Sequence, residues 1–115
     1  MCSTITQTPS EKILQRRLQM LIHSCIYYVF SENFITDHQF DIWNRELAAL
    51  QQKYPEESKV VPWYREFSDW TGRCGGSHLP LRNPWVINKS LRYIAFMLDK
   101  SVSEVANENG YIVLK

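Results

Sequence analysis

Apolar side chains recur every three or four residues along the first half of this chain. One stripe consists of Leu14, Leu18, Leu21, Cys25 and Val29, and a second consists of Phe40, Trp43, Leu47 and Leu50. This spacing places one face of an α-helix against a core. Ser10 is a suitable N-cap for the first helix. The second begins near Thr36 or Asp37, and Pro55 ends it because proline disfavours helical geometry in the preceding residue. The short connection predicts a long antiparallel helical hairpin.

The second half predicts two more helices. Asn83-Pro84 fits an N-cap and first helical position, with a helix to Lys100 that buries Trp85, Leu91, Ile94 or Ala95, and Leu98. Ser101 and Glu104 fit a capping box for a short last helix to Asn107, stopped by Gly110. Pro62 to Phe67 suits one helical turn, 68–83 an ordered loop, and Tyr111 to Leu114 a short strand or docked tail. The expected fold is mostly α: a flexible arm over residues 1–9, then a single small helical domain over 10–115, its hairpin packed by the third helix and the short C-terminal helix.

Composition restricts the partners and the compartment. The 115 residues carry 13 Lys+Arg and 12 Asp+Glu, a net charge of +1 that gives no case for strong direct nucleic-acid binding. No apolar run is long enough for a membrane span, and the N-terminus lacks an apolar signal core. Three cysteines without a CxxC pair indicate reduced thiols in a cytoplasm. Cys74 and His78 are too few to hold a metal ion, so no metal site is expected.

The stretch from Tyr27 to Asp41 combines features that a plain hairpin does not need. Tyr27 and Tyr28 stand at the end of the first helix, and Asp37 and Asp41 share one face at the start of the second. A ligand would use the tyrosines for stacking and the carboxylates as hydrogen-bond acceptors. Without a ligand, the tyrosines would cover the core edge, the helix dipole would favour the aspartates, and Arg45 would pair with Asp41.

The segment from Leu21 to Pro55 resembles the small N-terminal domain of bacterial NAD-dependent DNA ligases. The similar residues are Ile35-Thr36-Asp37-His38-Gln39-Phe40-Asp41, then Arg45-Glu46-Leu47, then Tyr54-Pro55-Glu56. That domain closes over the nicotinamide mononucleotide half of NAD. The resemblance implies that Tyr27 stacks on the nicotinamide ring while Asp37 and Asp41 contact ribose and carboxamide. Tyr28 replaces a usual histidine and Phe40 a usual tyrosine, which keeps stacking but removes polar contacts.

The resemblance covers one domain of the ligases and implies no ligase activity. No Lys-x-Asp-Gly nucleophile motif is present, so the chain is not expected to be an enzyme. It is more similar to compact, stand-alone ligase-related proteins of phages and prophages, which share Asp69-Trp70-Thr71-Gly72, Leu79-Pro80 and Pro84-Trp85. The first hypothesis is a non-catalytic domain that requires no cofactor and binds NMN or NAD, with Tyr28 and Phe40 beside the ring and Arg73 meeting phosphate from its glycine-rich loop.

A second hypothesis assigns the scaffold to protein binding. Four aromatic residues suit interface hot spots, namely Trp63, Tyr64, Trp70 and Trp85. They predict a phage-encoded inhibitor of a bacterial defence system, such as an anti-CRISPR protein, that binds a host protein in the bacterial cytosol. A hydrolase or transferase acting on NAD is a third reading, with no nucleophile or base identifiable beyond Asp37 and Asp41.

Overall fold

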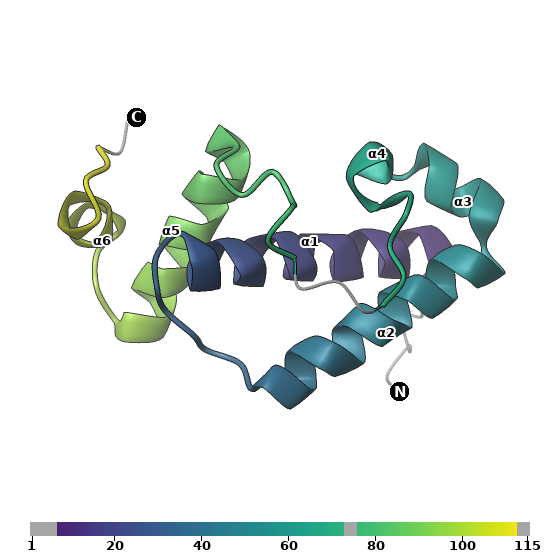
Figure 1. The fold of residues 1–115 in the computed structure, drawn as a ribbon. Coiled ribbons are helices and arrows are strands. Elements are labelled where there is room, and N and C mark those ends of the chain that lie inside the picture. Colours follow the sequence, from purple (N-terminus) through teal and green to yellow (C-terminus); the bar gives the residue numbers. More distant parts are fainter. Residues whose placement is uncertain (1–6, 73–75, 113–115) are drawn as a thin grey trace, which may run out of the picture. The chain divides into compact units, whose positions relative to one another are not determined.

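The computed structural model describes residues 7–72 and 76–112; residues 1–6, 73–75 and 113–115 lie outside the described part. Within it the chain forms helices and no strand, which confirms the predicted mostly α class (Figure 1). The helices are α1 (Pro9–Tyr28), α2 (Asp37–Lys53), α3 (Pro55–Val60), α4 (Tyr64–Phe67), α5 (Pro84–Leu98) and α6 (Val102–Glu108).

Contacts divide the described residues into two compact units. The first unit comprises 7–20 and 37–72, and the second comprises 21–36 and 76–112. Helix α1 is continuous through the boundary, so its first turns belong to one unit and its last turns to the other. Each unit is described by itself below.

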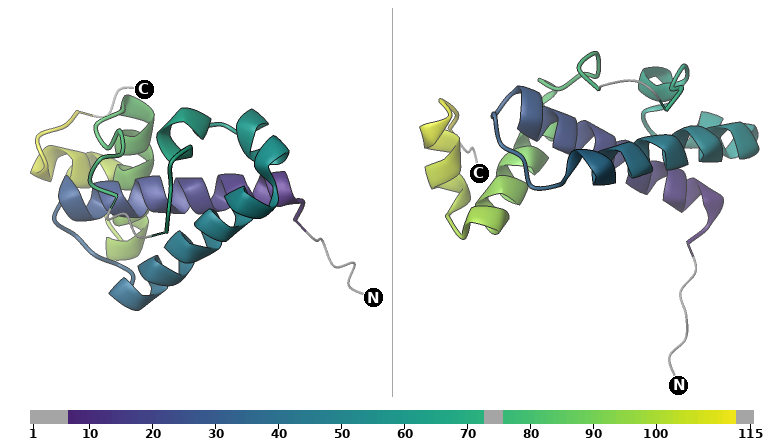
Figure 2. Two further views of the ribbon diagram at one scale, coloured as in Figure 1. Left: turned by 45° about the vertical axis from the view of Figure 1, so that its right-hand side comes forward. Right: turned by 60° about the horizontal axis from the view of Figure 1, so that its bottom comes forward.

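The first unit joins the start of α1 to α2, α3 and α4. In both views of Figure 2 the late turns of α2 run beside the early turns of α1. Arg16 Nε donates to Glu46 Oε2 at 2.8 Å, and Arg17 Nε donates to Gln51 Oε1 at 2.9 Å. Pro55 ends α2, as predicted, and also occupies the first turn of α3, a helix that the sequence analysis did not predict.

The buried stripe of the early α1 turns differs from the predicted one. Leu14 and Leu18 are only half-buried, whereas Ile13, Arg17 and Met20 are fully buried. The buried face includes Arg17, and a pattern that counts only apolar residues cannot identify a face that contains an arginine. The N-cap prediction was also wrong. Thr8 and Glu11 form a reciprocal capping box, with Thr8 N–H to Glu11 Oε1 at 3.0 Å and Glu11 N–H to Thr8 Oγ1 at 3.2 Å.

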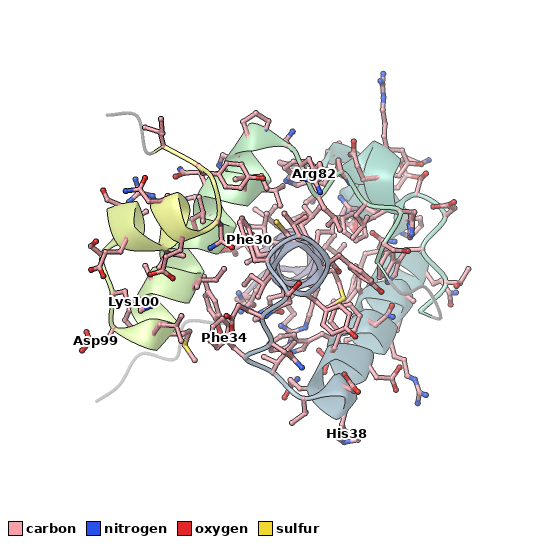
Figure 3. The ribbon with its side chains drawn as sticks, turned by 60° about the vertical axis from the view of Figure 1, so that its left-hand side comes forward. Phe30, Phe34, His38, Arg82, Asp99 and Lys100 are labelled. Atoms are coloured by element: carbon pink, nitrogen blue, oxygen red, sulfur yellow. The ribbon has the colours of Figure 1, made fainter. Side chains whose placement is uncertain are left out.

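The second unit packs the last turns of α1 with α5 and α6. Its core is built from the following apolar residues: Leu21, Cys25, Ile26, Phe30, Leu79, Leu81, Val86, Ile87, Leu91, Ile94, Ala95, Val105 and Ala106. The predicted caps are confirmed, since Asn83 Oδ1 accepts the Trp85 N–H at 2.9 Å and Ser101 forms a capping box with Glu104. Figure 3 shows Asp99 and Lys100 at the turn that leads from α5 to α6.

Two expectations for α5 are wrong. Trp85 and Leu98 were expected in the core, and each is 40% exposed. Trp85 lies on the side of α5 opposite the buried residues, at 100° per residue, and Leu98 stands at the last position, where the helix ends. The docked tail is partly described: Tyr111 N–H donates to Ala106 O at 2.8 Å, and residues 111 and 112 form no strand.

The turn after α1 contains an unusual residue for its backbone conformation. Glu32 N–H donates to Ile26 O at 3.0 Å, six residues earlier, and Ser31 between them has a φ of 56°, in the left-handed region. Glycine is the usual residue in this left-handed position because it lacks a Cβ. Packing of the neighbouring buried residues must therefore offset the conformational cost at Ser31.

We expect Ser31→Gly to stabilise the protein by about 0.5–1 kcal/mol. Glycine removes the energetic penalty of the left-handed conformation, and the greater conformational entropy of glycine in the unfolded chain offsets part of this effect. Ser31→Ala is the matched control, because alanine keeps the penalty and should not stabilise. Urea unfolding followed by circular dichroism measures both. A Ser31→Gly variant no more stable than Ser31→Ala would contradict this prediction.

Candidate functional site

The exposed aromatic pair at the end of α1 is the first part of the predicted site. Tyr27 is 55% exposed and Tyr28 is 47% exposed, whereas the preceding Cys25 and Ile26 are buried. The two tyrosine rings meet edge to face, with centroids 5.0 Å apart and an interplanar angle of 83°. About half of each side chain is accessible, so both rings present aromatic surface to solvent.

The connection after α1 is held by aromatic contacts of its own. Figure 3 shows Phe30 and Phe34 on this connection. Phe30 is buried with its centroid 5.8 Å from that of Tyr111, and Phe34 stands at the same distance from Tyr93 of α5. Asn33 Oδ1 accepts the N–H of Ile35 at 3.3 Å, which tightens the turn. These contacts fix where α1 ends within the second unit.

The acidic part of the predicted site belongs to the first unit. Asp37 is exposed in the first turn of α2, and Phe40 is half-buried one turn later. The predicted pairing of Asp41 with Arg45 is confirmed, at 3.0 Å between Asp41 Oδ2 and Arg45 Nη2. Their side chains are 47% and 75% exposed, so this pair contributes at most about 1 kcal/mol and leaves the carboxylate open to other partners. His38 marks the same exposed turn in Figure 3.

The Asp-aromatic-x-Gly segment is explained by its contact with α2. Trp70 is 5% exposed, and its Nε1–H donates to the carbonyl oxygen of Asn44 at 3.3 Å. Its ring lies against Phe67, with centroids 4.9 Å apart. Trp70 is thus a core residue of the first unit, and its ring is not part of the exposed surface that a protein partner would meet. Arg73, the predicted phosphate contact, lies outside the described residues.

The remaining aromatic candidates are divided between the units. In the first unit Trp63 is half-buried with a φ of 72°, and Tyr64 is 38% exposed. In the second unit Trp85 is 40% exposed, and Lys89 Nζ lies 5.7 Å from its ring centroid. Trp63 and Tyr64 are neighbours in sequence within the first unit, whereas Trp85 belongs to the second unit.

Burial shifts the pKa of two titratable groups in the second unit. Burial raises the pKa of the Cys25 thiol, with smaller opposing contributions from Ser90 and Arg82, so the thiolate nucleophile is disfavoured. Burial lowers the pKa of His23, whose ring meets Tyr93 edge to face. Over the described ranges, no three His, Cys, Asp or Glu residues are grouped so that they could hold a metal ion. Among the helices described, none is long and apolar enough to cross a membrane.

Comparison with known proteins finds DNA ligases that are similar to this chain over a small part of each ligase. The chain is 34% identical over 103 residues to a DNA ligase of Bacteroides fragilis, an alignment that covers 89% of this chain and 13% of the ligase. It is 42% identical over 53 residues to a DNA ligase of Pseudomonas aeruginosa, covering 46% of this chain and 7% of the ligase. A DNA ligase of Fusobacterium nucleatum is 34% identical over 67 residues, covering 58% of this chain and 9% of the ligase.

These similarities confirm the resemblance to part of a DNA ligase that the motif residues predicted. The chain spans only 7% to 13% of the length of these relatives. No protein-family model matches the chain, and no solved structure matches it. The chain is therefore a ligase-related helical protein.

Proposed function

We propose that this protein binds a nicotinamide-containing nucleotide, NMN or NAD, without transforming it. The observation that carries the proposal is the exposed pair Tyr27 and Tyr28, because two large aromatic side chains at a helix end lose favourable burial unless a ligand covers them. A flat pyridine ring is a suitable partner for such a surface. The similarity to DNA ligases supports this chemistry over other flat ligands.

The acidic residues of α2 complete the proposed recognition chemistry. Asp37 and Asp41 are four residues apart, so both carboxylates project from one face of the helix. Carboxylates accept hydrogen bonds from ribose hydroxyls and from a carboxamide N–H₂, and an ionised acceptor strengthens such bonds. In this proposal Tyr27 and Tyr28 stack with the pyridine ring, Phe40 supplies apolar surface, and Arg73 meets the phosphate.

The test is calorimetric titration of the protein with NMN and with NAD. Tyr27→Ala and Asp41→Ala should each weaken binding by at least about tenfold, which corresponds to 1.4 kcal/mol. Tyr64→Ala controls for loss of an exposed tyrosine elsewhere. Arg45→Ala controls for loss of the Asp41–Arg45 ion pair, because it breaks the same pair and keeps the carboxylate.

A double-mutant cycle tells whether the two groups act on one ligand. Tyr27→Ala and Asp41→Ala are combined in one variant, and coupling between their effects on NMN affinity reports a shared ligand. Absence of binding by either nucleotide at millimolar concentration would overturn the proposal. Equal losses in Arg45→Ala and Asp41→Ala would assign the effect to the ion pair.

A protein partner is the competing proposal, and one observation favours it. Phe96 is 82% exposed, and the next two residues, Met97 and Leu98, are 43% and 40% exposed at the end of α5. Exposed apolar residues gathered in this way are typical of interaction surfaces. An inhibitor of a bacterial defence protein would use such a surface together with Trp85. Failure of nucleotide binding together with a stoichiometric partner lost in Phe96→Ser would select this function.

A further inference from the structure

A groove in the first unit combines excess positive charge with an apolar wall. It has a volume of about 290 Å³ and is lined by Gln7, Lys12, Arg16, Glu46, Ala49, Leu50 and Lys53. On α1 the two lining cations are four residues apart, and on α2 the lining residues follow a spacing of three and four. One face of each helix therefore forms the groove, where the late turns of α2 pass the early turns of α1 (Figure 2).

The groove carries more positive than negative charge. Lys12, Arg16 and Lys53 contribute three positive charges and Glu46 one negative charge, which leaves an excess of two. Glu11, which precedes Lys12, has its carboxylate engaged by the Thr8 N–H at 3.0 Å. Three cations held close together repel one another unless an anion joins them. The local charge is thus distinct from the net charge of +1 of the whole chain.

Arg16 is the fixed element of this groove. Its Nε donates to Glu46 at 2.8 Å and its Nη1 donates to Gln19 at 2.8 Å, while its guanidinium carbon lies 5.9 Å from the Trp43 ring centroid. A guanidinium has five N–H donors in a rigid plane, so two bonds orient it and further donors remain for a ligand. Arg16 is therefore oriented before any anion arrives.

From this geometry we infer that the groove binds a small organic phosphate monoester. A phosphate dianion matches the excess charge of two, and Arg16 offers it the planar donor geometry that phosphate oxygens accept. Lys12 and Lys53 contribute two further cations to the lining, and Lys53 Nζ lies 5.4 Å from the Tyr54 ring centroid. Ala49 and Leu50 form an apolar wall for the organic part of the ligand. The monoester should therefore bind more tightly than inorganic phosphate.

This site is separate from the nucleotide-binding residues proposed above. Asp41 and Lys53 are twelve residues apart on α2, which is about 18 Å along the helix axis. The inference stands without the proposed function, because it uses none of the residues Tyr27, Asp37 or Asp41. The lining cations come from two helices and only their packing brings them together, so no spacing along the chain indicates this groove.

The experiment is a titration with phenyl phosphate, followed by amide chemical shifts of the ¹⁵N-labelled protein. We expect shifts at residues 12, 16, 49, 50 and 53, weaker binding of inorganic phosphate, and none of phenol. Lys12→Gln combined with Lys53→Gln should weaken phenyl phosphate binding about tenfold, because two charge contacts to one dianion are lost. Lys59→Gln on α3 is the matched control, since it removes a lysine that pairs with Glu56 in the same unit.

Glu46→Gln gives a result that a purely structural role would not produce. Glutamine keeps an acceptor for Arg16 Nε but removes the negative charge, so phenyl phosphate should bind about two- to fivefold more tightly. Asp41→Ala should leave this affinity unchanged, which separates the groove from the nucleotide proposal. Unaltered affinity in the Lys12/Lys53 double variant, or looser binding in Glu46→Gln, would overturn the inference.

Discussion

Replacement of Arg17 by methionine is expected to lower the free energy of unfolding by about 3–5 kcal/mol. Arg17 is fully buried, and its five N–H groups are all used: Nε to Gln51 Oε1, Nη1 to the carbonyl oxygens of Val61 and Pro62, and Nη2 to the carbonyl oxygen and Oγ of Ser58. The donor–acceptor distances run from 2.6 to 3.1 Å. One side chain thus joins α1 to α2, α3 and the start of the α3–α4 connection.

The loss of stability in Arg17→Met arises from the carbonyl oxygens that lose their donors and not from the removal of the charge. Burial lowers the pKa of Arg17 to about 10, with smaller opposing contributions from Tyr64 and Glu66. Because this folded-state pKa lies below the ordinary value, folding makes the charged form less favourable than it is in the unfolded chain, although Arg17 remains charged at neutral pH. A methionine would relieve that penalty, but the buried carbonyl oxygens of Ser58 and Val61 would lose the Arg17 donors, at about 1–3 kcal/mol each before relaxation, and the part-buried carbonyl oxygen of Pro62 would lose one as well.

Arg16→Met is the matched control for this prediction, since Arg16 is the adjacent arginine with a side chain 22% exposed and an ion pair to Glu46. It should cost no more than about 1 kcal/mol. Arg17→Lys should be intermediate, because an ammonium has three donors in place of five. Urea unfolding followed by circular dichroism measures all three. Equal losses in the Arg16 and Arg17 variants would show that the hydrogen-bond network contributes little.

Features that depend on residues close in sequence were predictable, whereas features that depend on distant residues were not. The bounds of α2, the Asn83 cap, the Ser101–Glu104 capping box and the Asp41–Arg45 pair were predictable because each depends on residues within four positions. Arg17 was not, because its acceptors lie 34 to 45 residues away. The buried face of early α1 was misplaced for the same reason.

The candidate site shows the same limit. Its residue types and their positions on two helix ends were readable from spacing, and the exposure of Tyr27 and Tyr28 agrees with a role outside the core. Trp70 looked like a surface aromatic because nothing local indicates that its N–H meets the carbonyl of Asn44, 26 residues earlier. A single chain pattern does not distinguish an exposed tryptophan from one buried by a distant helix.

Gly72→Ala is expected to destabilise the protein by about 2–3 kcal/mol, for two separable reasons. Gly72 has a φ of 82°, which costs an alanine roughly 1–2 kcal/mol. An added Cβ would also lie 3.2 Å from the Ala48 Cβ and 3.5 Å from the Arg45 Cα, so the loop after Trp70 would have to move away from α2 at a further cost of about 1 kcal/mol.

Gly110→Ala separates these two costs. Gly110 has the same φ of 82°, but an added Cβ there would meet no atom within 4 Å. It should therefore cost only the backbone term, about 1–2 kcal/mol, and the excess in Gly72→Ala measures the close approach of the loop to α2. Thermal and urea unfolding of both variants give that difference. Equal losses in the two variants would mean that the loop can move away from α2 without a measurable cost. The close approach of Gly72 to α2 would then contribute nothing to stability beyond the contacts of Trp70.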